Sequence, residues 1–160
     1  MKVCEEFYIN GEWVKPVNGL KTLDVINPAT EEVFGRIALG DKDDVDAAVE
    51  AAYSAFETFG FSSVEERISL LEKILEVYQG KYDEIAETIS SEMGAPIGLS
   101  KAAQAATGLG HFSTALETLK NYKFEEVKGS ALIRKEPIGV VGMITPWNWP
   151  INQISCKVGP

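Results

Sequence analysis

The segment Thr145-Pro146-Trp147-Asn148-Trp149-Pro150 places one polar side-chain amide between two tryptophans and two prolines. The prolines fix the backbone on either side of Asn148, whose amide offers two donors and an acceptor. A rigidly held amide donor can stabilise an oxyanion that forms at an attacked carbonyl, and losing such a donor costs about 10²–10³ in rate. The alternative is a turn asparagine that hydrogen-bonds the local backbone, and spacing alone favours that alternative.

Three other residues could carry chemistry. Lys157 is expected one or two turns inside a helix that Pro150 begins, either as a solvated lysine or as a buried one that modulates a nearby acid. Cys156 has no histidine, asparagine or aspartate placed to activate it, so we interpret it as a pocket-lining or packing residue. His111 is a lone histidine on an alanine-rich helix. The other cysteine, Cys4, falls in a terminus expected to be flexible, and the two cysteines show no metal-ligand spacing.

The apolar run Ile138–Ile144 comes directly before the Asn148 segment. Its length and continuity predict a strand that is buried on both faces, as in a parallel sheet. The Asn148 segment would then follow the carboxyl end of this strand, which is the edge where open α/β sheets bind ligands. Gly139 and Gly142 do not form a GxGxxG loop, so they are weak evidence for phosphate binding. No parallel neighbours remain in the sequence for such a strand, which suggests the front of a larger α/β fold.

The segments that must position these residues begin with short strands. Asn10-Gly11 predicts a hairpin turn between strands at 7–9 and 12–14. A second strand pair is expected at 23–26 and 32–37. A further polar hairpin, with strands at 123–127 and 131–135, is long enough to project from the body.

Four amphipathic helices are predicted between these strand regions. The first is capped by Asp41, ends at Gly60 and has one apolar face; this face consists of Val45, Ala48, Val49, Ala52, Phe56 and Phe59. Capping-box patterns at Ser62 and Ser63 open the second helix. The third ends at Gly94, and the fourth runs from about Leu99 to Tyr122.

Composition narrows the possible functions. The 160 residues carry a formal net charge of −9, which disfavours binding to nucleic acid because an acidic surface repels phosphates. The N-terminus has no signal-peptide pattern, and no apolar run reaches the ~20 residues of a membrane span. Two isolated cysteines suggest a reducing compartment. We therefore expect a soluble cytoplasmic protein that binds neither nucleic acid nor membrane.

Several motifs together resemble the aldehyde dehydrogenase superfamily, and they occur in that family's order along the whole chain. The segments are Phe7-Tyr8-Ile9-Asn10-Gly11-Glu12-Trp13-Val14, Ile26-Asn27-Pro28-Ala29-Thr30-Glu31-Glu32-Val33, Ser91-Glu92-Met93-Gly94-Ala95-Pro96, Glu136-Pro137-Ile138-Gly139-Val140-Val141-Gly142 continuing to Pro150, and Lys157-Val158-Gly159-Pro160. The resemblance implies an α/β fold in which N-terminal β-hairpins and helices lead into the first strand of a Rossmann-like parallel sheet, incomplete in this chain.

The resemblance also implies the chemistry. Such enzymes oxidise an aldehyde to a carboxylic acid with NAD or NADP, of which we favour NAD, through a cysteine thiohemiacetal and thioester. By this resemblance Asn148 donates to the oxyanion, which reverses the preference from spacing alone, and Lys157 supports the general-base network. The cofactor would lie along Ile144, Thr145, Pro146 and Trp147.

Two further sites follow from the same resemblance. The substrate tunnel would be lined by Trp149, Asn152, Gln153 and Cys156, and by Gln104 on the long helix. No catalytic metal is implied, but a structural monovalent cation could bind near Ile26 and Glu92. Because Asn152, Gln153 and Cys156 are polar or small, we expect a polar or short aldehyde.

The expected organisation assigns 1–122 and 138–160 to the N-terminal part of the NAD(P)-binding domain, and 123–137 to a hairpin that joins subunits into a homodimer or homotetramer. The catalytic domain and its nucleophilic cysteine match no part of this chain, which resembles approximately the family's first third. We therefore expect the chain alone to be inactive. The alternative is a non-catalytic fragment that acts as an oligomerisation or partner-binding module.

Overall fold

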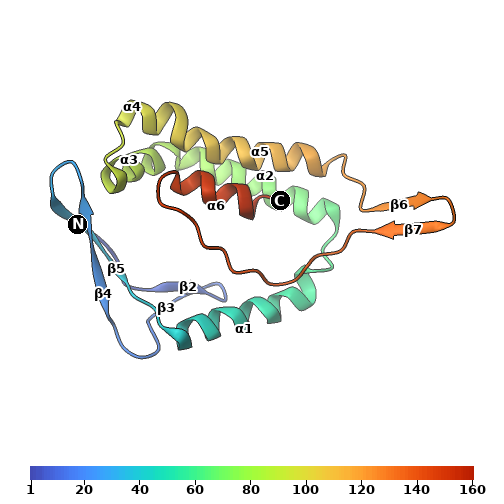
Figure 1. Ribbon diagram of the computed structural model, residues 1–160, viewed down its shortest axis with the longest axis horizontal. Coiled ribbons are helices and arrows are strands. Elements are labelled where there is room, and N and C mark those ends of the chain that lie inside the picture. The colour runs from blue at the N-terminus through green and yellow to red at the C-terminus, as the bar shows by residue number, and fades with distance from the viewer.

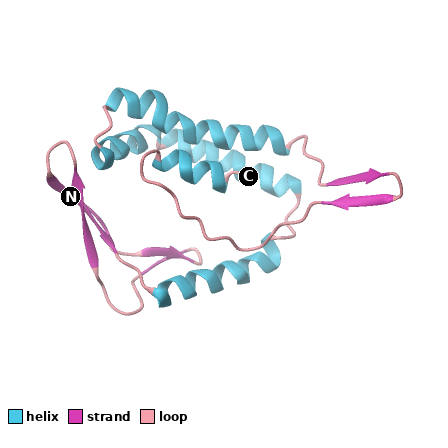
Figure 2. Cartoon of the chain, in the orientation of Figure 1, coloured by secondary structure: helices cyan, strands magenta, loops and turns pink.

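The computed structural model describes residues 1–160, and most of its helices stack into one layer (Figure 1). These are α2 (Val64–Gly80), α3 (Tyr82–Met93), α4 (Ile97–Leu99), η1 (Ser100–Gln104), α5 (Ala105–Leu119) and α6 (Pro150–Val158). Helix α1 (Lys42–Phe59) lies apart from this layer, and the strands occupy its two ends (Figure 2). None of the helices combines the length and apolar character that a membrane crossing requires.

The core forms where α2 and α5 pack together. Leu71, Tyr78, Phe112 and Leu116 are its buried members. The hydroxyl of Tyr78 donates to the backbone oxygen of Ala105 at 2.7 Å. This close approach of the two helices requires a glycine at position 108, because a Cβ there would lie 2.3 Å from the Tyr78 hydroxyl. The small residues of the long helix thus allow close packing.

Local capping signals set the helix boundaries as predicted. Asp41 caps α1 in a capping box with Asp44, and Ser63 caps α2 in a capping box with Glu66. Gly94 ends α3 in the left-handed conformation. The long helix is interrupted by one feature that periodicity did not predict, the π-helical turn η1.

The N-terminal strands form two small sheets. β2 (Phe7–Ile9) and β3 (Glu12–Val14) make the predicted hairpin, and Asn10 and Gly11 at its turn both have positive φ, at 52° and 81°. β4 (Thr22–Asn27) pairs antiparallel with β5 (Glu32–Ala38), also as predicted.

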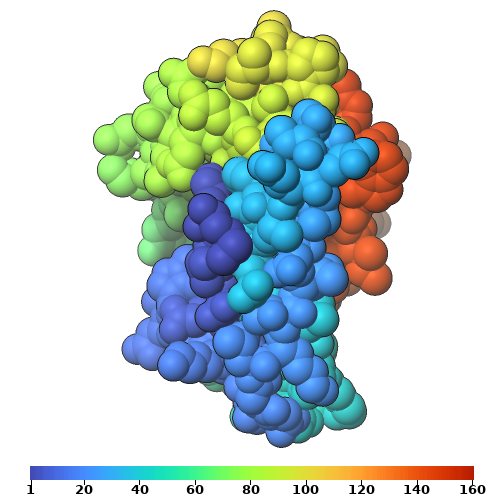
Figure 3. Space-filling view, turned by 90° about the vertical axis from the view of Figure 1, so that its left-hand side faces the viewer, coloured from blue at the N-terminus to red at the C-terminus, as the bar shows by residue number.

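The N-terminus is not the loose segment we expected. Residues Lys2–Cys4 form β1, which pairs in parallel with β5. Lys2 also donates to the hydroxyl of Thr88 on α3 at 2.7 Å. The three-stranded sheet therefore adjoins the helical layer, and Figure 3 shows its blue strands beneath the yellow-green helices.

The hairpin of β6 (Glu125–Lys128) and β7 (Ala131–Arg134) confirms the predicted strands near 123–135. It projects from one end of the molecule (Figure 1). Every residue of both strands is exposed, including Val127 at 74%.

The predicted buried strand at Ile138–Ile144 is wrong for this structure. The segment is an irregular connection that runs from β7 back to α6 (Figure 1). Ile138 and Ile144 are 94% and 95% exposed. Residues 136–148 have no backbone hydrogen bond to another segment, because no strand of the chain lies beside them. A strand needs a paired neighbour, so apolar character alone does not form one.

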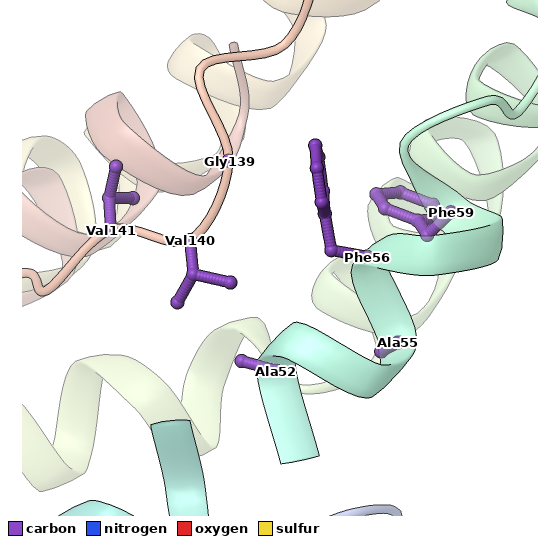
Figure 4. A pocket seen from close by; sticks show the side chains of 7 residues that line it. All are labelled: Ala52, Ala55, Phe56, Phe59, Gly139, Val140 and Val141. Atoms are coloured by element: carbon purple, nitrogen blue, oxygen red, sulfur yellow. The ribbon is translucent and has the colours of Figure 1, made fainter. Parts of the chain in front are cut away.

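The apolar face of α1 is also largely uncovered. Val45, Val49 and Phe59 on this face are exposed. Ala52, Ala55, Phe56 and Phe59 instead line one side of an apolar hollow of about 290 Å³, and Gly139, Val140 and Val141 line the other (Figure 4). The two apolar segments face one another without closing on a shared core.

Candidate active site

The candidate site is built around α6. Pro150 occupies the first turn of the helix, where its missing N–H costs nothing. Ser155 is fully buried and donates to the backbone oxygen of Ile151 at 2.6 Å. An ideal Cβ on Gly159 would lie 3.4 Å from the Cβ of Ala115 on α5. The stripe of Ile151, Ser155 and Gly159 thus seats α6 against α5.

Asn148 lies immediately before this helix and is exposed. The N-terminus of α6 has no side-chain cap, so its first N–H groups remain available as donors. A helix N-terminus also carries a partial positive charge. The Asn148 amide and the helix terminus together suit a negative charge that develops on an oxygen, although the contact itself is a prediction.

The two tryptophans that flank Asn148 do not enclose it. Trp147 is 81% exposed, and only Trp149 is half-buried. The predicted cofactor residues, Ile144 to Trp147, are all exposed. They form an open apolar edge that leads directly to Asn148.

Four predicted tunnel residues lie on α6 or directly before it. Trp149 is the N-cap residue, and at 100° per residue Asn152, Gln153 and Cys156 fall within an arc of about 100° on the helix. All four are half-buried, and this arc flanks the stripe that contacts α5. The fold therefore places them on a common surface, as a tunnel wall would require.

Lys157 is exposed at the outer edge of this arc. Its ammonium donates to the backbone oxygen and to Oε1 of Gln153, both at 3.0 Å, and lies 3.8 Å from the Sγ of Cys156. The sequence left open whether Lys157 is solvated or buried beside an acid, and the structure shows it exposed. It is not paired with an acid here, so its role in a base network remains a prediction.

Gln104 is the one predicted tunnel residue that lies away from α6. It ends η1, is only 3% exposed, and its Oε1 has no hydrogen-bond partner. Ser100, at the start of the same π-helical turn, also has an unpaired buried oxygen. Gln104 therefore lies within the helix packing.

The predicted cation site joins two elements that meet in the fold. α3 contacts β4, and an ideal Cβ on Gly94 would lie 2.9 Å from the ring of Pro28. Ile26 and Glu92 each lie two residues from this contact. No group of three or more His, Cys, Asp or Glu side chains could hold a metal, so any ion here would depend on backbone oxygens.

The sequence singled out His111 but did not reveal its partner, Asn152. His111 on α5 approaches Asn152 on α6, and its Nε2 lies 2.7 Å from Oδ1 of Asn152. The two residues are 41 positions apart, so no spacing rule pairs them. A histidine on an otherwise small-residue helix was the only available signal.

The comparisons with known proteins agree with the motifs. The aldehyde dehydrogenase family model matches residues 13–160. The 3-succinoylsemialdehyde-pyridine dehydrogenase of Pseudomonas sp. is 49% identical over 161 residues, which cover 100% of this chain and 34% of that protein.

Two crystal structures are similar along nearly the whole chain. The aldehyde dehydrogenase from Bartonella henselae has a TM-score of 0.93 and 43% identity over 97% of this chain and 33% of its own. A mutant of aldehyde dehydrogenase C from Pseudomonas syringae, in complex with NAD+ and octanal, has a TM-score of 0.94 and 42% identity over 98% of this chain and 32% of its own. The chain spans about a third of the length of these relatives.

Proposed function

The chain belongs to the aldehyde dehydrogenase family, and from this premise we propose that it forms part of an enzyme that oxidises an aldehyde to a carboxylic acid with NAD(P). The observation that carries the proposal is the continuous arrangement of an open apolar edge, an exposed amide at Asn148 and a common face on α6. These would contact the cofactor, the reacting carbonyl and the substrate, in that order along the chain.

The roles within the site follow from the chemistry of the side chains. Asn148 would donate to the carbonyl oxygen as negative charge develops there. NAD(P) would supply the hydride acceptor. The edge Ile144–Trp147 suits such a cofactor, because its side chains are exposed and its backbone groups are not used by neighbouring strands. We favour NAD, since a relative with 42% identity binds NAD+.

The substrate class is the second part of the proposal. Asn152, Gln153 and Cys156 give the α6 face a polar character, so we infer a polar or short aldehyde. Relatives differ in this respect: one is named for a pyridine-bearing semialdehyde and another binds octanal. A preference for long aliphatic aldehydes over polar ones of equal length would contradict this inference.

We further propose that residues 123–137 join two copies of the chain and that 1–122 and 138–160 belong to the NAD(P)-binding domain. The exposed strands of the β6–β7 hairpin support the first assignment, since they offer free edges for pairing. A structural cation near Ile26 and Glu92 is also proposed. A non-catalytic binding module is the competing function, and only the exposed hairpin favours it.

The experiment is a hybrid enzyme, in which residues 1–160 are followed by the remaining two thirds of the 49% identical Pseudomonas dehydrogenase. We expect the hybrid to reduce NAD+ when an aldehyde is added, faster than it reduces NADP+, and to release the carboxylic acid. Residues 1–160 alone should give no turnover, since neither Cys4 nor Cys156 matches the family's nucleophile. A folded, soluble hybrid that reduces neither cofactor would contradict the proposal.

A further inference from the structure

The contact between His111 and Asn152 links two helices at the edge of the candidate tunnel. Nε2 of His111 lies 2.7 Å from Oδ1 of Asn152, which is the length of a strong hydrogen bond. Both residues are half-buried. Figure 1 shows α5 and α6 side by side, so the contact bridges neighbouring elements.

The helices themselves hold this distance. The buried Ser155 and the close approach of Gly159 to Ala115 fix α6 against α5. Asn152 follows Ile151, which packs against the core cluster, so its Cα cannot move far from α5. His111 precedes Phe112, which is a buried member of that cluster. Each partner is therefore anchored through its immediate neighbour.

The chemistry of the pair sets the direction of the hydrogen bond. Oδ1 of an amide only accepts, so Nε2 of His111 must carry the proton that it donates. An amide whose oxygen is held on one side presents its two N–H donors on the other. With the proton on Nε2, His111 holds the Asn152 side chain in the orientation that the structure shows.

We propose that His111 is a positioning residue that turns the Nδ2 donors of Asn152 toward the substrate, so that the site prefers aldehydes that carry a hydrogen-bond acceptor. This inference rests on the proposed function, because Asn152 belongs to the predicted tunnel face. It deepens that function by assigning the preference for polar aldehydes to one pair of residues. His111 itself does not touch the reacting atoms.

The hydrogen bond can be tested without activity, because His111 is the only histidine of the chain. Long-range ¹H–¹⁵N NMR spectra of residues 1–160 should show the tautomer with the proton on Nε2 and a slowly exchanging Hε2. Asn152→Leu should remove the protection of that proton. A tautomer with the proton on Nδ1, or an Hε2 that is unaffected by Asn152→Leu, would overturn the proposal.

The role of the bond is tested in the hybrid enzyme with two aldehydes of equal length. 4-Methoxybutanal carries one ether oxygen in place of a methylene group of hexanal. We expect His111→Leu to lower kcat/KM for the methoxy aldehyde, relative to hexanal, by roughly two- to tenfold, mainly through KM. His111→Gln should restore the ratio, since its amide can donate to the same oxygen. Thr114→Ala, on the exposed side of α5, serves as the matched control and should leave the ratio unchanged.

The outcomes separate this inference from the proposed function. If the hybrid oxidises both aldehydes and His111→Leu lowers both equally, the positioning role fails while the enzyme assignment stands. Failure of His111→Gln to restore the ratio would also reject it. If the folded hybrid oxidises neither aldehyde, the proposed function fails, and the role that depends on it fails with it.

Discussion

Asn148 is weak evidence for an oxyanion-binding site when only its neighbours in the sequence are considered. Its position in the structure makes that evidence stronger. Taken alone, an asparagine between prolines is most simply a turn residue. In the structure it lies just before an uncapped helix N-terminus and remains exposed. Its side chain is therefore available to a ligand, and we propose that this ligand is the oxygen of an aldehyde.

Asn148→Ala in the hybrid enzyme tests that role. We expect kcat to fall by about 10²–10³, because the amide would act mainly on charge that develops in the transition state. Steady-state rates at saturating cofactor and aldehyde measure the effect. Asn121→Ala is the matched control, since this exposed asparagine lies at the end of the α5 region. A loss of less than about threefold for Asn148→Ala would argue against an oxyanion role.

Tyr78 supports the site from the core, and its pKa gives a pH test. Burial raises the pKa of Tyr78 from 10.0 to about 12, and nearby Tyr82 adds to this effect. Tyr78→Phe should destabilise residues 1–160 by about 1 kcal/mol near neutral pH, because the bond to Ala105 is lost. Urea unfolding monitored by circular dichroism measures the difference.

The sign of the pH dependence follows from the raised pKa. The stabilisation by Tyr78 is fully present below pH 10, where the side chain is neutral in both the folded and the unfolded state. Between pH 10 and about 12 the unfolded Tyr78 ionises first, so the advantage of wild type over Tyr78→Phe falls by up to about 1.4 kcal/mol per unit and reverses before pH 12. A constant advantage from pH 7 to 12 would contradict the raised pKa.

At the scale of the elements, the site depends on how α2, α5 and α6 stack. α5 contacts α2 on one side through Tyr78 and α6 on another through Ser155 and Gly159. The position of the predicted tunnel face of α6 therefore depends on how α5 packs against the core. A change in the spacing of α2 and α5 should be transmitted to the site.

Two glycines on α5 allow that spacing to be tested. Gly108→Ala should destabilise the chain by about 1–3 kcal/mol, because the added Cβ would lie 2.3 Å from the Tyr78 hydroxyl. Gly110→Ala should stabilise it by about 0.5–1 kcal/mol, because nothing lies within 4 Å and alanine favours a helix. Urea midpoints of the two variants measure both effects. Equal changes in the two variants would show that the helices do not approach as closely as described.

Across the whole molecule, much apolar surface is exposed, and it includes the face of α1, the segment at 138–144 and the β6–β7 hairpin. The acidic net charge of −9 opposes self-association but does not hide apolar side chains. The hairpin differs from the other two because it projects away from the body (Figure 1).

Val127→Asp tests the assignment of the hairpin to subunit contacts. Since Val127 is 74% exposed, the unfolding free energy of residues 1–160 should change by no more than about 0.5 kcal/mol. The hybrid enzyme, in contrast, should lose its oligomeric state, as measured by light scattering after size-exclusion chromatography. Phe61→Asp, an exposed apolar site away from the hairpin, is the control. An unchanged molar mass for the Val127→Asp hybrid would remove the hairpin from the interface.

The amino-acid sequence alone determined the features that depend on neighbouring residues. The Asn10-Gly11 turn, the caps at Asp41 and Ser63 and the start of α6 at Pro150 all form as predicted, because turns and caps use local backbone geometry. The order of motifs also led to the family, which the matched residues confirm.

Only the tertiary structure decided the features that depend on distant partners. The pairing of His111 with Asn152 and of β1 with β5 joins residues that no periodicity relates. The apolar run at 138–144 has the composition of a buried strand but is exposed, because a strand forms only where a neighbour supplies its hydrogen bonds. The local sequence limits which secondary structures a segment can form, and the neighbouring segments determine which of them forms.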